Sequence, residues 1–445
     1  MLVLKGLARA FAIARVAIVL ALLPHALDWR SPFLASIRFW AFIGLTAIPL
    51  AIVIAEIRAL RRAATRSDRA LSSAALALAA AGVICVVGFE VQFWWARYEV
   101  LRADPALLER LGRHIVVGYR DINELQALLE RRAIAGVFVT AGNVRGRDVA
   151  AIRREIAAMQ EERRRQSLPA LLIATDQEGG IVSRLSPPLA HMPPLAEIAA
   201  RHPAGAERHM AVRDYAAAQA RELADLGVNV NLAPVVDIDH GIINPGDRFT
   251  RISARAISAD PEIVTEVAET YCAQLSGNGV RCTLKHFPGL GRVVADTHLQ
   301  TADLALSPSE LASSDWLPFR ALMRRDDVIV MLGHARLTAL DRNRPVSFSR
   351  PVVRGLLRTD WGYDGILMTD DFSMGAVTRS REGIGGASVE ALNAGVDLIL
   401  VSYDPDQFYL VMHALMRAAR ASALHEDALE QSDRRLAKAW PIRAR

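Results

Sequence analysis

The chain has 445 residues, 52% of them hydrophobic, and a sequence pI of about 9.3. Its net positive charge comes from the first hundred residues, which carry 11 Lys and Arg against 5 Asp and Glu, whereas residues 101–445 sum to −1. The high pI therefore gives no support for a nucleic-acid-binding face on the larger part, and we expect no nucleic-acid partner.

Three long apolar stretches occupy the front of the chain, at residues 10–27, 39–55 and 74–95. Each is near the roughly 20 residues that a membrane-spanning helix needs. We predict a membrane region with three transmembrane helices over residues 1–100 and a separate larger domain over residues 101–445. Buried helices of a soluble protein, or a cleaved signal peptide over the first stretch, are the alternatives.

Charges in and between these stretches predict how they sit in a bilayer. Arg15 and Glu90 lie inside apolar stretches, so each must snorkel or face a protein partner. The connection after the first stretch is nearly neutral, whereas the second is rich in arginine, which the positive-inside rule places in the cytoplasm. We therefore predict a multi-pass protein of the bacterial inner membrane whose larger domain is periplasmic or otherwise extracytoplasmic. The arginines are Arg58, Arg61, Arg62, Arg66 and Arg69.

From residue 113 onward, eight short apolar runs alternate with amphipathic stretches. Apolar runs without polar alternation are typical of parallel strands buried on both faces. Eight strand–helix units over about 300 residues predict an α/β fold, a closed (β/α)8 TIM-like barrel preceded by the three transmembrane helices. The runs are 114–118, 136–140, 170–174, 228–233, 281–284, 328–332, 365–368 and 397–401. The clearest helical patterns cover 148–165, 206–226, 262–275 and 351–359.

Unusual polar residues follow the apolar runs, at the strand ends that carry the active site in this fold. Lys285 is one of only three lysines against 50 arginines, which indicates a site that needs a compact ammonium. Asp237 and His334 fit equally well as polar residues of the core or as support for the site. The polar residues that follow the apolar runs are Asp176, Asp237, Lys285 with His286, His334, and Asp370 with Asp371.

The three cysteines do little to define the compartment. Cys85 lies in an apolar stretch, Cys272 in a helical pattern and Cys282 in a strand. A disulfide between the last two is conceivable, but we expect two reduced thiols, because buried thiols in adjacent packed elements are the ordinary case. The sequence contains no Cys/His cluster with metal-ligand spacing, so we expect neither a metal nor a cofactor.

Residues 285–298 read Lys-His-Phe-Pro-Gly-Leu-Gly-Arg-Val-Val-Ala-Asp-Thr-His. This segment resembles the Lys-His-Phe-Pro-Gly-His-Gly…Asp-Ser-His pattern of glycoside hydrolase family 3, most closely its single-domain β-N-acetylglucosaminidases. Two further segments resemble that family: 176–184, which reads Asp-Gln-Glu-Gly-Gly-Ile-Val-Ser-Arg, and 368–374, which reads Met-Thr-Asp-Asp-Phe-Ser-Met. The resemblance spans roughly residues 105–420.

The resemblance implies that Asp370 is the nucleophile of a retaining glycosidase, which needs a carboxylate on one face of the sugar. On general grounds Asp370 could instead be a helix cap, a role that Asp371 fits better. The resemblance also implies that His298, oriented by Asp296, is the acid/base. Imidazole titrates near neutrality, and a neighbouring carboxylate can hold its tautomer. Outside this motif, an Asp-x-His would be an ordinary surface loop.

The resemblance implies that Asp176, Lys285 and His286 bind sugar hydroxyls, together with an arginine after the fourth strand. Arg255 fits that arginine best, because it stands just before an Asp-Pro helix start. Leu290 departs from the family's histidine in Gly-His-Gly, and we expect any hydrogen bond made there in relatives to be absent. Arg248 and Arg251 are the alternatives to Arg255.

The predicted function is a retaining exo-β-N-acetylglucosaminidase acting on peptidoglycan fragments or related glycans, with a carbohydrate substrate and a membrane as its partners. About 25 residues follow the eighth unit, too few for the second domain that carries the acid/base in many β-glucosidases of the family. The alternatives are a β-N-acetylglucosaminide phosphorylase, a β-glucosidase, and a degenerate membrane-tethered glycan-binding protein. Retention of Asp370, Asp296 and His298 argues against the last.

Overall fold

The computed structural model describes residues 2–63 and 65–441. The chain forms two compact units, a helical unit at Met1–Arg102 and a barrel unit at Ala103–Arg445.

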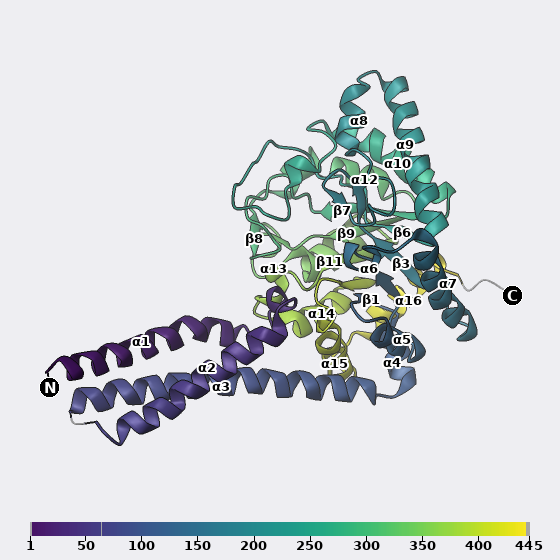
Figure 1. Cartoon of the computed structure of the whole chain (residues 1–445). Coiled ribbons are helices and arrows are strands. Elements are labelled where there is room, and N and C mark those ends of the chain that lie inside the picture. Colours follow the sequence, from purple (N-terminus) through teal and green to yellow (C-terminus); the bar gives the residue numbers. More distant parts are fainter. Residues whose placement is uncertain (1, 64, 442–445) are drawn as a thin grey trace. The chain divides into compact units, whose positions relative to one another are not determined.

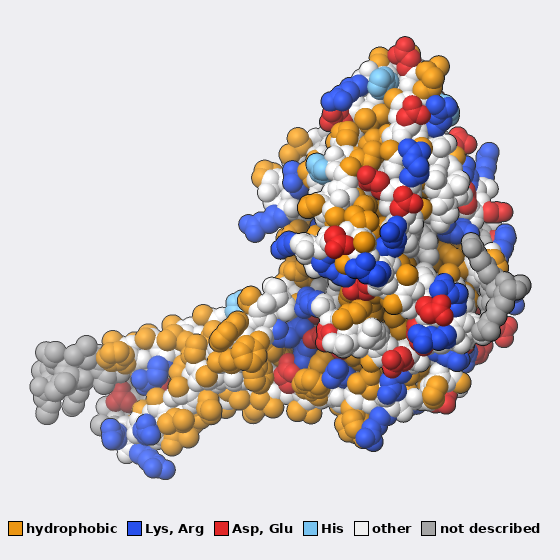
Figure 2. All heavy atoms as spheres, turned by 45° about the vertical axis from the view of Figure 1, so that its right-hand side comes forward, with side chains coloured by type: hydrophobic (Ala, Val, Ile, Leu, Met, Phe, Trp, Pro, Cys, Tyr) orange, Lys and Arg blue, Asp and Glu red, His pale blue; other side chains and the backbone are white. Residues whose placement is uncertain are grey.

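The helical unit consists of three long helices that run side by side (Figure 1). All three are long and apolar enough to cross a membrane, as predicted. Their outward faces are apolar, with Ile18, Ile54 and Ile84 among the exposed side chains, and the space-filling view shows an almost continuous hydrophobic surface along the unit (Figure 2). The helices are α1 (Leu2–Leu27), α2 (Arg38–Leu60) and α3 (Arg66–Leu101), with a 3-10 turn, η1, at Pro32–Leu34.

Charged residues inside the apolar helices are paired within the helical unit. The Arg15 guanidinium lies 2.5 Å from the carboxylate of Glu56, which joins α1 to α2. Glu90 on α3 accepts bonds from the Trp29 indole at 2.6 Å and from Arg30 at 2.7 Å. Arg15 and Glu90 therefore each pair with an oppositely charged side chain of the protein and do not face lipid unpaired, which is one of the two expected arrangements.

The barrel unit is a closed barrel of eight parallel strands, so the predicted fold is confirmed. Each strand pairs with the next one along the chain, and the last pairs with the first, where Val116 stands opposite Leu400. The barrel strands are β1 (Ile115–Gly118), β2 (Gly136–Phe138), β3 (Leu172–Thr175), β6 (Val230–Asn231), β7 (Arg281–Phe287), β9 (Val328–Leu332), β11 (Ile366–Asp371) and β12 (Leu398–Val401).

Helices surround the barrel (Figure 1). Side-chain caps start several of them: Asp148 accepts from Ala151 N–H and Asp260 from Glu262 N–H. The longer ones are α4 (Pro105–Gly112), α5 (Ile122–Glu130), α7 (Val149–Arg165), α9 (Gly205–Leu226), α10 (Pro261–Gly277), η4 (Pro351–Asp360, a π-helix), α14 (Gly383–Ala394), α15 (Gln407–Arg420) and α16 (Glu426–Ala439). The short ones are α6 (Ala141–Val144), α8 (Leu195–Arg201), η2 (Ile252–Ala254), α11 (Pro308–Ala312), α12 (Leu317–Leu322), η3 (Val346–Phe348) and α13 (Gly375–Thr378).

The barrel interior is filled by side chains such as Val116, Phe138, Met331 and Leu400, so the barrel is a packed core rather than a pore. Leu436 and Trp440, at the end of the chain, pack against this core. Two small sheets lie outside the barrel: β4 (Gln177–Gly179) with β5 (Val182–Ser183), and β8 (Ala302–Leu304) with β10 (Ala335–Leu337).

Two strands extend further than their apolar runs predicted. β7 continues through Lys285 and His286 to Phe287, and β11 continues through Asp370 to Asp371. The register shifts between Leu284 and Phe287, and again in β11, so each strand end is irregular. The polar residues therefore belong to the strand ends themselves, where the backbone of a rigid element positions them.

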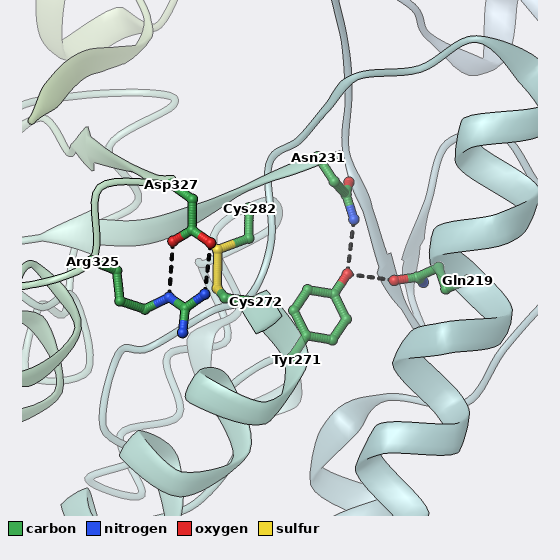
Figure 3. The surroundings of a disulfide bond; sticks show 7 residues. All are labelled: Gln219, Asn231, Tyr271, Cys272, Cys282, Arg325 and Asp327. Atoms are coloured by element: carbon green, nitrogen blue, oxygen red, sulfur yellow. Dashed lines mark hydrogen bonds and ion pairs between the residues drawn. A yellow bond between two sulfur atoms is a disulfide. The ribbon is translucent and has the colours of Figure 1, made fainter. Parts of the chain in front are cut away.

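The expectation of two reduced thiols was wrong, because Cys272 on α10 and Cys282 on β7 form a disulfide (Figure 3). The two Cα atoms are 5.3 Å apart, within the range that a disulfide bridges without backbone movement. The packing of α10 on β7 brings two thiols ten residues apart in sequence to that distance.

Candidate active site

A buried cluster of four charged groups lies at the ends of β3 and β7. The Lys285 ammonium is 2.5 Å from a carboxylate oxygen of Asp176 and 2.6 Å from one of Glu178. Arg255 donates two bonds to Glu178, from Nε at 2.9 Å and from Nη2 at 2.5 Å. The formal charges of the two cations and the two carboxylates in this cluster therefore sum to zero. Burial raises the pKa of the Glu178 carboxyl, but the charges of Arg255 and Lys285 outweigh burial and hold that pKa well below its usual range.

His286 stands beside this cluster and is oriented by a fully buried carboxylate. Its Nδ1 lies 2.7 Å from Oδ2 of Asp237, whose oxygens also accept the His286 and Leu290 backbone N–H groups. Since Nδ1–H donates to Asp237, Nε2 is the nitrogen that faces outward, and Arg255 Nη2 lies 3.4 Å from it. Asp237 is therefore a support for His286.

The two aspartates at the end of β11 have different surroundings. Asp371 accepts four bonds, from the N–H groups of Ser373, Ser402 and Tyr403 and from the Ser402 hydroxyl, at 2.6 to 3.0 Å. Asp370 accepts a bond from the Asp371 N–H at 2.8 Å. The Asp371 carboxylate is thus committed to holding the loops after β11 and β12, which leaves Asp370 as the carboxylate that can react.

Three histidines surround Asp370 electrostatically. Burial raises the pKa of the Asp370 carboxyl, but the interactions with His286, His334 and His298 outweigh burial and hold that pKa below its ordinary value. His334 is fully buried, and burial lowers its own pKa. Its ring bonds Ser347 Oγ at 2.8 Å and the Asp371 carbonyl at 3.0 Å.

The Asp296–His298 pair forms a hydrogen-bonded dyad. Nδ1 of His298 lies 2.9 Å from Oδ1 of Asp296, and that oxygen also accepts from the His298 N–H at 2.9 Å and the Thr250 hydroxyl at 2.9 Å. Burial raises the pKa of the Asp296 carboxyl, but its bonds to His298 and Thr250 hold it well below the usual range. With Nδ1 engaged, Nε2 of the half-buried His298 ring is the atom that can exchange a proton with a bound molecule.

The loop that carries His298 is tied to the loop that follows Asp370. The Gly375 N–H donates to the His298 carbonyl at 2.7 Å, and the Ala376 N–H donates to the Thr297 carbonyl at 3.2 Å. A Cβ at Gly375 would lie 2.3 Å from the Leu299 carbonyl oxygen, so only glycine permits this approach. The dyad and the strand end that bears Asp370 are therefore held together by backbone contacts.

Leu290, the departure from the family pattern, is buried in a small apolar cluster with Ile252, Ala256 and Ala335. Its side chain thus serves packing, while its backbone N–H bonds Asp237. In the same loop, Nε of Arg292 lies 3.1 Å from the buried carboxylate of Asp315.

Among the three candidate arginines, only Arg255 places its side chain in the charged cluster. Arg248 and Arg251 meet the site loops through their backbone N–H groups, which donate to Asp296 and Asp247. Glu178 was missed in the sequence analysis, although it lies two residues after Asp176 in the same motif. That spacing in an extended segment, which turns both side chains to one side, was the available signal.

Comparisons with known proteins agree with this geometry. Residues 106–439 match the glycosyl hydrolase family 3 N-terminal domain. The β-hexosaminidase LpqI of Mycobacterium tuberculosis is 33% identical over 342 residues, which cover 75% of this chain and 83% of that protein. The solved structure of M. tuberculosis LpqI has a TM-score of 0.65 at 30% identity, over 77% of this chain and 98% of that one. A family 3 β-N-acetylglucosaminidase from Paenibacillus has a TM-score of 0.68 at 27% identity, over 76% of this chain and 63% of that one. The protein described here therefore belongs to glycoside hydrolase family 3.

Proposed function

We propose that the barrel unit is a retaining exo-β-N-acetylglucosaminidase that removes terminal β-linked N-acetylglucosamine from peptidoglycan fragments or related glycans. The observation that carries the proposal is an ionised carboxylate, Asp370, held among histidines beside a separate Asp296–His298 dyad. The β-hexosaminidase and β-N-acetylglucosaminidase names of the relatives support the class of sugar.

In the first step, an Asp370 oxygen attacks the anomeric carbon of the terminal sugar. The bond from that carbon to the leaving oxygen breaks, and His298 transfers its Nε2 proton to this oxygen. Asp296 stabilises the imidazolium beforehand and holds its tautomer, as the carboxylate does in a catalytic triad. The product of the step is a glycosyl ester on Asp370 and a released alcohol.

In the second step, His298, now neutral, removes a proton from a water molecule, whose oxygen attacks the same carbon and displaces Asp370. Two inversions leave the β configuration unchanged. A histidine suits both steps, because one imidazole can serve as acid and then as base near neutral pH without a raised carboxyl pKa.

The charged cluster holds the sugar at its nonreducing end. Asp176, Lys285, His286 and Arg255 offer acceptors and donors to hydroxyl groups, and Glu178 fixes the two cations through its three bonds. Burial strengthens these bonds, since they form away from bulk water.

Initial rates on nitrophenyl β-N-acetylglucosaminide and nitrophenyl β-glucoside, each with and without inorganic phosphate, test the proposal. We expect a higher kcat/KM for the N-acetylglucosaminide, no dependence on phosphate, and the β-anomer as the first product seen by NMR. Comparable kcat/KM values for both sugars would indicate a β-glucosidase. A phosphate-dependent rate that yields a sugar 1-phosphate would indicate a phosphorylase.

We further propose that the helical unit anchors the enzyme in a bacterial inner membrane as a multi-pass protein, with the barrel unit on the periplasmic side. The five arginines at the end of α2, in the connection after it and at the start of α3 are exposed, which favours a cytoplasmic location for this end of the helical unit. The Cys272–Cys282 disulfide supports an oxidising compartment for the barrel.

Reporter fusions test this orientation. Alkaline phosphatase joined after residue 105 should be active, because that enzyme needs an oxidising compartment to form its disulfides. A cytoplasmic fluorescent reporter at the same position is the control and should be dark. An inactive phosphatase together with a fluorescent control would place the barrel inside the cell.

A further inference from the structure

Two carboxylates of the sugar site, Asp176 and Glu178, flank a residue whose backbone is held by a buried side chain. Asn231, at the end of β6, is fully buried. Its Oδ1 accepts from the Gln177 N–H at 3.0 Å, and its Nδ2 donates to the Gln177 carbonyl at 2.9 Å. The Asn231 carboxamide thus bonds both the backbone N–H and the backbone C=O of Gln177, as a neighbouring strand would.

The direction of the side chains explains what this pairing controls. Successive side chains of an extended segment point to opposite sides, so Asp176 and Glu178 share one side and Gln177 takes the other. The Gln177 side chain accordingly leaves the site, bonding the Leu185 N–H at 2.9 Å and Ser186 Oγ at 2.7 Å. A rotation of the Gln177 backbone would therefore move both carboxylates away from Lys285.

We propose that Asn231 is a positioning residue of the sugar site: its carboxamide fixes the backbone of Gln177 and so sets the two carboxylates on either side. This inference rests on the proposed function, because it assigns Asp176 and Glu178 to sugar binding. Asn231 itself touches no reacting atom.

Tyr271 keeps the carboxamide of Asn231 in the required orientation. The second hydrogen of Nδ2 is directed to the Tyr271 hydroxyl at 2.9 Å, and that hydroxyl donates its own hydrogen to Oε1 of Gln219 (Figure 3). Because its hydrogen is committed to Gln219, the phenol can only accept from Asn231, which excludes a flipped amide. Burial raises the pKa of Tyr271 well above its ordinary value, so the phenol stays neutral and remains a donor.

The disulfide gives this network a rigid base. Cys272 directly follows Tyr271 on α10, and its partner Cys282 stands three residues before Lys285 on β7. Lys285 contacts the carboxylates of Asp176 and Glu178 directly. Two contacts therefore hold the carboxylates: the Asn231 pairing fixes their backbone, and Lys285 pairs with their charge. The disulfide joins α10, which carries Tyr271, to β7, which carries Lys285 (Figure 3).

Two substitutions at Asn231 separate positioning from general stability. Asn231→Leu keeps the approximate volume and removes all three bonds. Asn231→Asp loses the donor when ionised, whereas its protonated form restores the two-point pairing, with O–H donating to the Gln177 carbonyl and C=O accepting from its N–H. A misplacement near 1 Å can cost on the order of 100-fold, so we expect kcat/KM to fall about 10- to 100-fold, mainly through KM.

The measurement is KM on nitrophenyl β-N-acetylglucosaminide between pH 5 and 9, with the full-length protein in detergent. A mechanism-based fluoro-glycoside that traps the glycosyl-enzyme counts the active sites. The ratio of the Asp variant's KM to that of the wild type should fall as the pH is lowered, while the Leu variant's ratio should stay high. The active-site count converts the maximal rate to kcat. A KM equal to that of the wild type in both variants at every pH would overturn the proposal.

Tyr271→Phe provides a milder test if the Asn231 variants do not fold. It removes one hydroxyl, and we expect KM to rise several-fold. Tyr363→Phe is the matched control, because Tyr363 is also buried and its hydroxyl bonds the Ile366 carbonyl at the start of β11. Equal KM values for these two variants would refute the role of Tyr271 and Asn231. If the wild type cleaves only a glucoside, the proposed substrate is wrong, and the same comparison is made with that glucoside.

Discussion

Neutralising Glu178 is the most direct way to test the charged cluster. In the wild type, Glu178 accepts two bonds from Arg255 and one from Lys285, and its side chain is only 6% exposed. Glu178→Gln keeps the shape but leaves Asp176 as the single anion facing two buried cations. The amide nitrogen would also place a donor against another donor.

The cost follows from the burial of the cluster. Removing one partner of a buried ion pair costs about 3–5 kcal/mol, because the other charge remains desolvated. For a unit the size of the barrel, Ala103–Arg445, that loss lowers Tm by roughly 4–7 °C. We also expect KM to rise, since Arg255 and Lys285 lose the anion that orients them. Glu161→Gln is the control: its pair with Arg164 is exposed, and such pairs contribute about 0–1 kcal/mol.

The pH dependence gives a second check on the same residue. The pKa of Glu178 is depressed in the folded protein, so its contribution is fully present above the ordinary carboxyl pKa and is lost as the pH falls. The difference in Tm between the wild type and Glu178→Gln should therefore be constant near neutrality and shrink below about pH 4. Thermal unfolding of the purified protein measures both effects. A loss of stability no larger than that of Glu161→Gln, with an unchanged KM, would refute the charge balance described here.

Three further predictions concern the proposed catalytic residues. Asp370→Asn should lower kcat by several powers of ten at unchanged Tm, because the ester can no longer form; a rate above about a tenth of the wild type would contradict this role. His298→Ala should harm substrates with poor leaving groups far more than nitrophenyl glycosides, since only the former need a proton on the departing oxygen; equal losses on both would remove His298 from that role. Asp296→Asn should show a weaker version of this pattern, together with a Tm deficit that closes as the pH falls below about 4, because the pKa of Asp296 is held down in the fold. A Tm deficit that stays constant down to pH 2 would show that the carboxylate charge of Asp296 does not stabilise the fold.

The roles of the two β11 aspartates show how far a motif can be followed. The Thr-Asp-Asp pattern ranked Asp370 as nucleophile and Asp371 as a cap before any contact was known. In the structure Asp371 is occupied by bonds to Ser373, Ser402 and Tyr403, which supports a structural role for Asp371, while the nucleophile role of Asp370 stays a prediction. Those partners come from the loops after β11 and β12, which the closed barrel places side by side.

Much of the architecture follows from the sequence alone, because its signals are local. Apolar runs without alternation indicate strands buried on both faces, and long apolar stretches indicate membrane helices, whatever lies elsewhere in the chain. Arg255 was preferred over Arg248 and Arg251 because the family's arginine stands just before a similar helix start, and its side chain lies in the charged cluster. Each of these inferences needs only neighbouring residues.

Only the tertiary structure could show the role of Glu178, the Asn231 pairing and the disulfide. Glu178 meets Arg255 77 residues away, and Asn231 meets Gln177 54 residues away, and these partners come together only in the folded barrel unit. Cys272 and Cys282 are close in sequence, but their pairing depends on how α10 packs against β7. Burial, pairing and pKa all depend on these distant partners, so no local pattern in the chain specifies them.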